Sequence, residues 1–132
     1  MKSVHTSGTR KRATARATLR QGKGVVTVNR LLLDCYEPKL ARLKIMEPLV
    51  LADKISKKLN ISVIVNGGGQ ISQAEAARVA IAKALVEYSK SNALKETFLK
   101  YDRHLLVADT RRKETCKPND SKARAKRQKS YR

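Results

Sequence analysis

The large aliphatic residues of this chain lie mostly between Leu19 and Val107, whereas the positive charge is concentrated outside that stretch. Net charge divides the chain into three parts: +7 over residues 1–23, +4 over residues 24–110 and +8 over residues 111–132. After Cys116 there is no Leu, Ile, Val, Met or Phe, so burial cannot offset the entropy cost of ordering that segment. We therefore expect a globular body at residues 1–110 and an extended basic tail at residues 111–132.

The overall net charge of +19 on 132 residues demands an anionic partner, either nucleic acid or a membrane surface. The longest apolar runs cover only a few residues, which excludes a membrane-spanning helix. Cys35 and Cys116 have no neighbour at metal-ligand spacing, so neither a disulfide scaffold nor a zinc module is expected, and a reducing, cytosolic compartment fits. One Phe, four Tyr and no Trp leave little aromatic surface for stacking on bases.

Residues 12–20 alternate strictly between polar and apolar side chains, which predicts a strand with one cationic face and one small apolar face. The cationic face consists of Arg12, Thr14, Arg16, Thr18 and Arg20, preceded by Arg10 and Lys11. Alternate residues of a strand lie about 6.6–6.8 Å apart, so these donors form a row that can reach successive phosphates. The alternative is a solvated strand face, although such faces usually mix charges of both signs.

Further patterns predict a mixed α+β fold, with helices packed on a small sheet. A turn at 21–24 leads to a strand at 25–29, and we expect these two strands to form a hairpin. The other predicted elements are a helical region over 37–58 that Pro48 breaks or kinks, a strand at 61–65, a helix started by the capping box Ser72–Glu75 and ending near Ser89, a further helix capped by Asn92, and a last strand at 105–107.

Three consecutive glycines, Gly67, Gly68 and Gly69, stand between the predicted strand and the long helix. The order of strand, glycine loop and helix resembles a nucleotide site, but the Walker sequence and the third glycine of the dinucleotide pattern are both absent. A tight connection chosen only for its shape is a second interpretation. We favour a third, in which backbone N–H groups of the loop contact an RNA phosphate.

The tail carries many cations and no acid after Asp120, and when fully extended it reaches roughly 70 Å. Such a segment can thread into folded RNA, although a solubility or localisation tail is the plainer alternative. Catalysis has little support, because His5 and His104 are far apart and no nucleophile–base arrangement or carboxylate pair stands out. We therefore expect no enzyme, no cofactor, no metal and no small-molecule substrate.

Several ordered motifs together resemble a known family. They are residues 8–17 (GTRKRATARA), Val28-Asn29, Glu47-Pro48-Leu49, Val65 to Gly69, Leu105 to Arg112, and the terminal Gln128-Lys129-Ser130-Tyr131-Arg132. This set is similar to small-subunit ribosomal protein nine, which is numbered sixteen in eukaryotes. The stretch 105–112 and the ending resemble the archaeal and eukaryotic branch of that family.

The resemblance implies a fold like the second domain of ribosomal protein five, with a left-handed βαβ crossover that departs from the usual rule. It also implies a place in the head of the small subunit, on the 3′ major domain of its rRNA and beside other ribosomal proteins. The expected rRNA contacts are Arg10, Lys11, Arg12, Thr14, Arg16, Arg20, Gly67, Gly68, Gly69, Arg111, Arg112, Arg124 and Lys126. The expected contacts to the peptidyl-site tRNA are Gln128, Lys129, Tyr131 and Arg132.

The function expected from these observations is that of a structural constituent of a small ribosomal subunit of the 40S type. The protein would act in the cytoplasm, after assembly in the nucleolus if the source is eukaryotic, with no membrane partner. The alternative is a free-standing basic RNA- or DNA-binding or chaperone protein, which explains the charge but not the ordered body.

Overall fold

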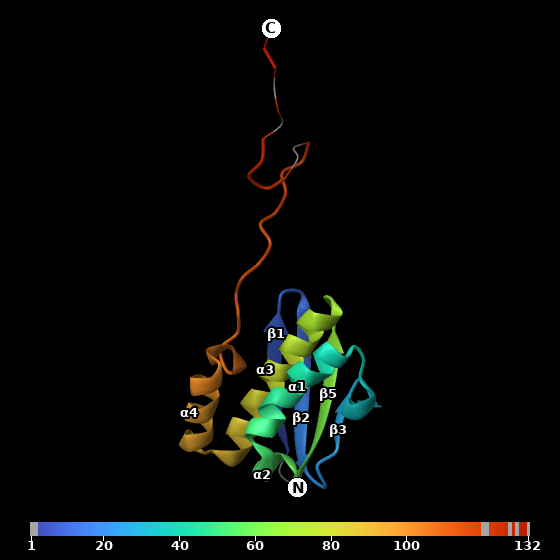
Figure 1. Cartoon of the computed structure of the whole chain (residues 1–132), viewed down its shortest axis with the longest axis vertical. Coiled ribbons are helices and arrows are strands. Elements are labelled where there is room, and N and C mark those ends of the chain that lie inside the picture. The colour runs from blue at the N-terminus through green and yellow to red at the C-terminus, as the bar shows by residue number, and fades with distance from the viewer. Residues whose placement is uncertain (1–2, 120–121, 127, 129, 132) are drawn as a thin grey trace.

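A computed structural model describes residues 3–119, 122–126, 128 and 130–131 of the chain. Its centre is a five-stranded sheet with the order β1-β2-β5-β3-β4. Figure 1 shows β1, β2, β5 and β3 side by side in that order. The strands are β1 (Val4–Arg10), β2 (Ala13–Gln21), β3 (Val26–Val28), β4 (Leu31–Leu32) and β5 (Leu59–Asn66). All neighbouring strands are antiparallel except β3 and β5, which are parallel.

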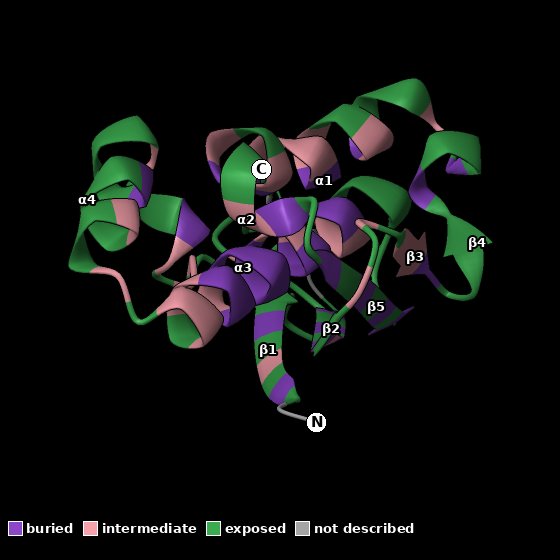
Figure 2. Ribbon diagram, turned by 90° about the horizontal axis from the view of Figure 1, so that it is seen from below, coloured by how far each residue is buried: buried purple, intermediate pink, exposed green. Residues whose placement is uncertain are grey.

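Helices cover one face of the sheet. They are α1 (Lys39–Leu51), α2 (Asp53–Ser56), α3 (Gln70–Ser89) and α4 (Asn92–Tyr101), and two short 3-10 turns, η1 (Leu33–Cys35) and η2 (Arg103–Leu105), complete the fold. Figure 2 shows the helices on one side of the strands and the purple, buried residues gathered between the two layers. The mixed α+β class, with helices packed on a small sheet, is therefore confirmed.

Alternation along β2 and β5 builds the core. Ala13, Ala15, Ala17 and Leu19 of β2 are at most 1% exposed and point toward the helices, while the residues between them point away. Strand β5 repeats this pattern with Leu59, Ile61, Val63 and Val65 inside. Helix α3 contributes mostly alanines to the same core, which lets it lie close to the sheet.

The closest approach of helix and sheet is at Gly8 in β1. A Cβ atom at that position would lie 2.3 Å from the backbone oxygen of Ala76 and 2.7 Å from the nitrogen of Ala80. Thr6 of the same strand donates its hydroxyl to the carbonyl of Ala80 at 2.8 Å. Strand β1 was not predicted, because Val4 is the one aliphatic residue among its inward positions and the others, Thr6, Gly8 and Arg10, are small or polar.

The predicted hairpin of residues 12–20 with residues 25–29 is wrong. Strand β2 forms its hairpin with β1, and β5 lies between β2 and β3. Asn60 of β5 explains the separation, because its Oδ1 accepts hydrogen bonds from the backbone N–H groups of Lys23 (2.9 Å) and Val25 (3.2 Å). These bonds attach the connection after β2 to β5, so the chain passes β5 before it forms β3 and does not turn back directly along β2.

The connection from β3 through α1 to β5 has the unusual hand that the resemblance implied. Seen from the helix side with β3 and β5 pointing up, the chain passes from β3 on the right, through α1 in front, to β5 on the left (Figure 1). A right-handed crossover would step to the right. The observed connection is therefore left-handed.

Three other sequence predictions are corrected by the structure. Pro48 does not break the helix: it is buried within α1, which continues to Leu51 and ends at Ala52. The predicted strand at 105–107 is absent, because Asp102 accepts a hydrogen bond from the His104 N–H at 2.8 Å and starts the 3-10 turn η2. Asn92 is not the cap of α4 but its first residue, and the cap is Ser91, whose hydroxyl accepts from the Leu94 N–H.

Candidate nucleic-acid interface

The uncovered face of the sheet carries the polar side chains of the alternating strands. Thr14, Arg16 and Arg20 of β2 are exposed there, as the alternation predicted, and Thr18 is half-buried between them. Most of their neighbours across the sheet are also polar: Thr18 pairs with His5 of β1 on one side and with Ser62 of β5 on the other, whereas the β5 neighbour of Arg16 is the exposed Ile64. His5 Nδ1 and the Thr18 hydroxyl lie 3.0 Å apart, so this row is ordered by its own contacts.

The turn between β1 and β2 lies against the glycine loop. Gly67 and Gly68 have φ angles of +73° and +68°, a region that side chains with a Cβ rarely adopt. A Cβ on Gly67 would lie 2.7 Å from the carbonyl oxygen of Arg12, and one on Gly68 would lie 3.0 Å from Ala13. The backbone of the loop therefore packs directly against the β1–β2 turn, which carries the two cations Lys11 and Arg12.

The helix after the glycine loop starts earlier than the sequence predicted. Helix α3 begins at Gln70 with Gly69 as its N-cap, and no side chain caps its first N–H groups. The predicted capping box is therefore wrong, since Ser72 and Glu75 already lie inside the helix. The first turn of α3 faces the same end of the molecule as the Arg12 turn, where free N–H groups favour an anion.

Glu75 has a different role from the predicted one. Its carboxylate accepts from Arg10 Nε at 2.8 Å and from Lys44 Nζ at 2.8 Å, which links α3 to β1 and α1. Burial raises the pKa of Glu75, but the hydrogen bonds and charges of Lys44 and Arg10 outweigh it, so the pKa lies below its ordinary value. Arg10 is accordingly engaged inside the body, with only 16% of its side chain exposed.

The root of the tail is bound to the same network. Asp109 lies 3.3 Å from Arg10 Nη2 and 2.7 Å from Arg111 Nη2, and hydrogen bonds from Arg111 hold its pKa well below the usual range. The guanidinium of Arg112 donates to the carbonyl of Lys11. The first tail residues therefore start beside the turn of the β1–β2 hairpin.

A second ion cluster joins the remaining helices. Arg78 of α3 contacts Glu47 of α1 and, at 2.9 Å, Asp102 at the end of α4. Burial raises the pKa of Asp102, whereas the hydrogen bond from the His104 N–H and the contact with Arg78 lower it. The lowering is the larger effect, so the pKa of Asp102 lies below its ordinary value. Both clusters line one cleft of about 230 Å³. This network was not predicted from the sequence. The acids Glu75, Asp102 and Asp109 could have indicated it, because a carboxylate in so basic a chain readily pairs with cations.

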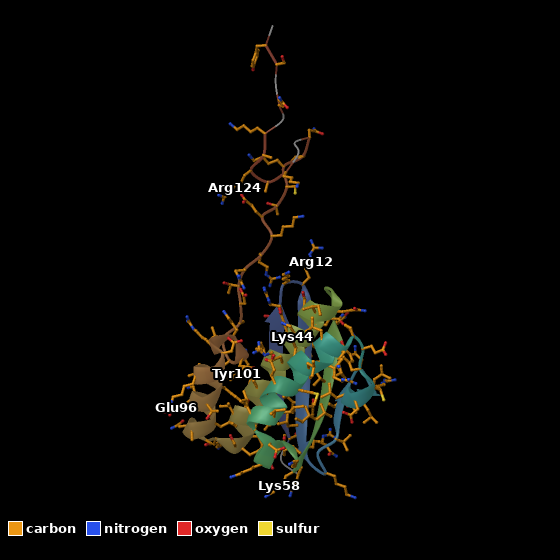
Figure 3. The ribbon with its side chains drawn as sticks, viewed as in Figure 1. Arg12, Lys44, Lys58, Glu96, Tyr101 and Arg124 are labelled. Carbon is orange, nitrogen blue, oxygen red and sulfur yellow. The ribbon has the colours of Figure 1, made fainter. Side chains whose placement is uncertain are left out.

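The described tail residues extend away from the body. Figure 1 shows the tail running past the end of the molecule that holds the glycine loop, and Figure 3 shows Arg124 on the tail, beyond Arg12 at the end of the body. Arg124 pairs with Glu114 at 2.9 Å, and both side chains are exposed. Lys126, Gln128 and Tyr131 are exposed as well. Lys129 and Arg132 lie outside the described residues.

The predicted site residues thus fall into four groups. Lys11, Arg12, Gly67, Gly68, Gly69, Arg111 and Arg112 gather at one end of the body, which we call the tail pole. Thr14, Arg16 and Arg20 lie along the open sheet face. Arg10 is held in the interior network, and Arg124 with the following residues lies on the tail.

The described residues lack the features of two other kinds of site. No helix among them is long and apolar enough to cross a membrane. Within the same residues, no group of three or more His, Cys, Asp or Glu side chains is arranged to hold a metal ion.

Residues 8–132 match the family described as ribosomal protein S9/S16. The chain belongs to this family. It is 49% identical over its full length to the full length of small ribosomal subunit protein uS9 of Methanococcus vannielii. Two full-length relatives of the same name, from strains of Methanococcus maripaludis, are each 48% identical.

Membership of this family makes the chain a structural constituent of the small ribosomal subunit and not an enzyme. Its partners are accordingly ribosomal RNA and ribosomal proteins, and its place in the cell is the ribosome. The resemblance noted from the motifs, including the archaeal branch, is confirmed. The alternative of a free-standing chaperone does not account for this membership.

Proposed function

We propose that the tail pole and the open sheet face hold rRNA of the 3′ major domain in the subunit head, while the tail reaches the tRNA in the peptidyl site. The body at residues 1–110 acts as the main rRNA-binding unit. In the extension at residues 111–132, the rRNA contacts are Arg111, Arg112, Arg124 and Lys126, and the tRNA contacts are Gln128, Lys129, Tyr131 and Arg132. The relatives are archaeal, so we assign the protein to a cytoplasmic particle of the 30S type, without a nucleolar stage.

One observation supports this proposal above the others: the turn at Lys11 and Arg12, the glycine loop and the root of the tail meet at one pole. Exposed cations, backbone N–H groups and the start of α3 face the same region there. Such groups fix the register of a protein on phosphates without reading base identity. A tail leaving from that pole continues in the direction of the bound RNA.

The tRNA role is tested by deleting Lys129 to Arg132. We expect subunits carrying the truncated protein to assemble almost normally, because the deleted residues lie beyond the body. Binding of tRNA to the peptidyl site, measured by filter retention on purified subunits, should weaken. If assembly fails while tRNA affinity stays unchanged, the assignment of body and tail is reversed.

The rRNA role is tested through the salt dependence of binding. Each lost phosphate contact lowers the slope of log K against log salt by about 0.7–0.9. Replacing Lys11 and Arg12 by Gln should therefore lower the slope for an rRNA fragment of the 3′ major domain by about 1.4–1.8. The control is Lys95→Gln on α4, an exposed cation far from the tail pole, which should leave the slope unchanged. Equal slopes for all three proteins would refute the proposal.

A further inference from the structure

The open sheet face contains two adjoining hollows. One, of about 360 Å³, is lined by residues of β1, β2 and β5 that include His5, Ser7 and Arg16. The other, of about 420 Å³, lies between β2 and β5 and includes Arg20, Asn60 and Ser62. Thr18 lines both hollows and therefore stands at the centre of the face.

The polar side chains of this face are arranged in two directions, along β2 and across the strands. Along β2, Arg16 and Arg20 are separated by four residues, or about 13 Å, with Thr18 midway between them. Across the strands, His5, Thr18, Ser62 and Thr27 occupy one paired row. Among the described residues whose side chains lie on this face of β1, β2 and β5, none is acidic and none is Phe, Tyr or Trp.

We propose that the open sheet face binds the minor groove of an A-form RNA duplex, with the hydroxyls of Thr18 and Ser62 on ribose 2′-OH groups. Arg16 and Arg20 contact the phosphates on either side. This inference rests on the proposed rRNA-binding function and names the form of RNA that one of its surfaces recognises.

Three observations favour a duplex RNA over other nucleic acids. Single-stranded RNA is recognised largely by stacking on aromatic side chains, and the described part of this face offers only His5, which is held by Thr18 at 3.0 Å. The A-form minor groove is wide and shallow and displays 2′-OH groups, which suits a flat, hydroxyl-bearing surface. The minor groove of B-DNA is about 6 Å wide, too narrow for a hydroxyl row flanked by arginines about 13 Å apart, and it offers no 2′-OH.

The test compares three probes with the full chain at one salt concentration, by fluorescence anisotropy. The probes are a 16-base-pair RNA duplex, a DNA duplex of the same sequence and one strand of the RNA alone. The tail and tail pole contribute phosphate binding to every probe, so the informative quantity is the ratio of affinities. We expect the RNA duplex to bind about tenfold more tightly than the DNA duplex. In the double variant Thr18→Val with Ser62→Ala, the RNA affinity should fall about tenfold and the DNA affinity should stay within twofold.

Matched variants control for misfolding. Thr18→Ser keeps the hydroxyl and should retain the preference for the RNA duplex. Thr97→Val on α4 removes an exposed threonine hydroxyl elsewhere and should change none of the affinities. If Thr18→Val fails to fold, Ser62→Ala alone must still lower RNA binding more than DNA binding.

Three outcomes would overturn the inference: equal affinity of the unmodified chain for both duplexes, an equal loss for both in the double variant, or tighter binding of the single strand, which would assign the face to unpaired RNA. The rRNA function itself is tested separately, by the salt dependence of rRNA binding in the Lys11 and Arg12 variant. If the slope falls in that variant as expected, but the unmodified chain binds both duplexes equally, only the duplex inference is refuted.

Discussion

The two ends of this chain carry almost the same charge but differ in structure. Residues 1–23 have a net charge of +7 and residues 111–132 of +8. The described part of the first segment consists mainly of two paired strands, whereas the described residues of the second contain no helix or strand. The difference is the apolar residues placed at every second position of β2, for which the tail has no counterpart. The positive charge of both segments therefore indicates an anionic partner. The apolar alternation determines which of the two segments forms regular structure in the absence of that partner.

The largest change in the free energy of unfolding should come from substitutions on the inner face of β2. Leu19 is fully buried, so Leu19→Ala should lower the free energy of unfolding by about 3 kcal/mol through lost burial and the cavity left behind. Arg16→Ala on the outer face of the same strand should change it by less than about 0.5 kcal/mol. Urea unfolding of both variants measures the difference. A comparable loss in both would show that order in this segment does not depend on the apolar face.

An intermediate effect is expected at Glu75, which ties the first segment to the helices. Glu75→Gln removes the negative charge and leaves one acceptor oxygen for the two donors Arg10 and Lys44, and it should destabilise the protein by about 2 kcal/mol at pH 7. Because the folded state lowers the pKa of Glu75, its contribution is present above the ordinary glutamate pKa of about 4.3 and is lost as the pH falls through the lowered value.

The difference in stability between the two proteins should therefore shrink between about pH 5 and pH 2, which thermal unfolding across that range would measure. The control is Glu87→Gln, an exposed carboxylate on the same helix, for which we expect less than about 0.5 kcal/mol. A pH-independent difference between Glu75→Gln and the unmodified protein would mean that the ion pairs do not set the acid sensitivity.

The smallest effect is expected in the tail. Arg124 and Glu114 form an ion pair, but their side chains are 88% and 55% exposed. Exposed pairs of this kind contribute little, so Glu114→Gln should change the free energy of unfolding by less than about 0.5 kcal/mol. A larger loss, measured by the same urea unfolding, would show that the tail contributes to the stability of the body.

The sequence allowed prediction of those parts that local periodicity determines. The two-faced strand β2, the strand β5 and the long helix α3 were all foreseen, because alternation and helical spacing are visible within a few residues. The strand partners were not, since the insertion of β5 between β2 and β3 depends on the contacts that Asn60 makes with a distant loop. Strand β1 was also missed, because Thr6 and Gly8, which pack against α3, interrupt the apolar pattern of its inward positions.

The candidate site shows the same division. The exposed positions of Thr14, Arg16 and Arg20 followed from the alternation. Arg10 belongs to the same basic motif, yet it points to the helix side and is engaged by Glu75 and Asp109. Since those two acids lie 65 and 99 residues away in sequence, no local pattern could separate Arg10 from its exposed neighbours.

The contact between Arg10 and Asp109 also has a consequence for the order in which the molecule is completed. During synthesis the β1–β2 hairpin emerges early, and its arginine can meet Glu75 once α3 has been made. The second carboxylate, Asp109, follows Glu75 in the chain and therefore arrives after the first ion pair can form. The direction in which the residues after Asp109 leave the body is therefore fixed only once the hairpin and α3 are in place.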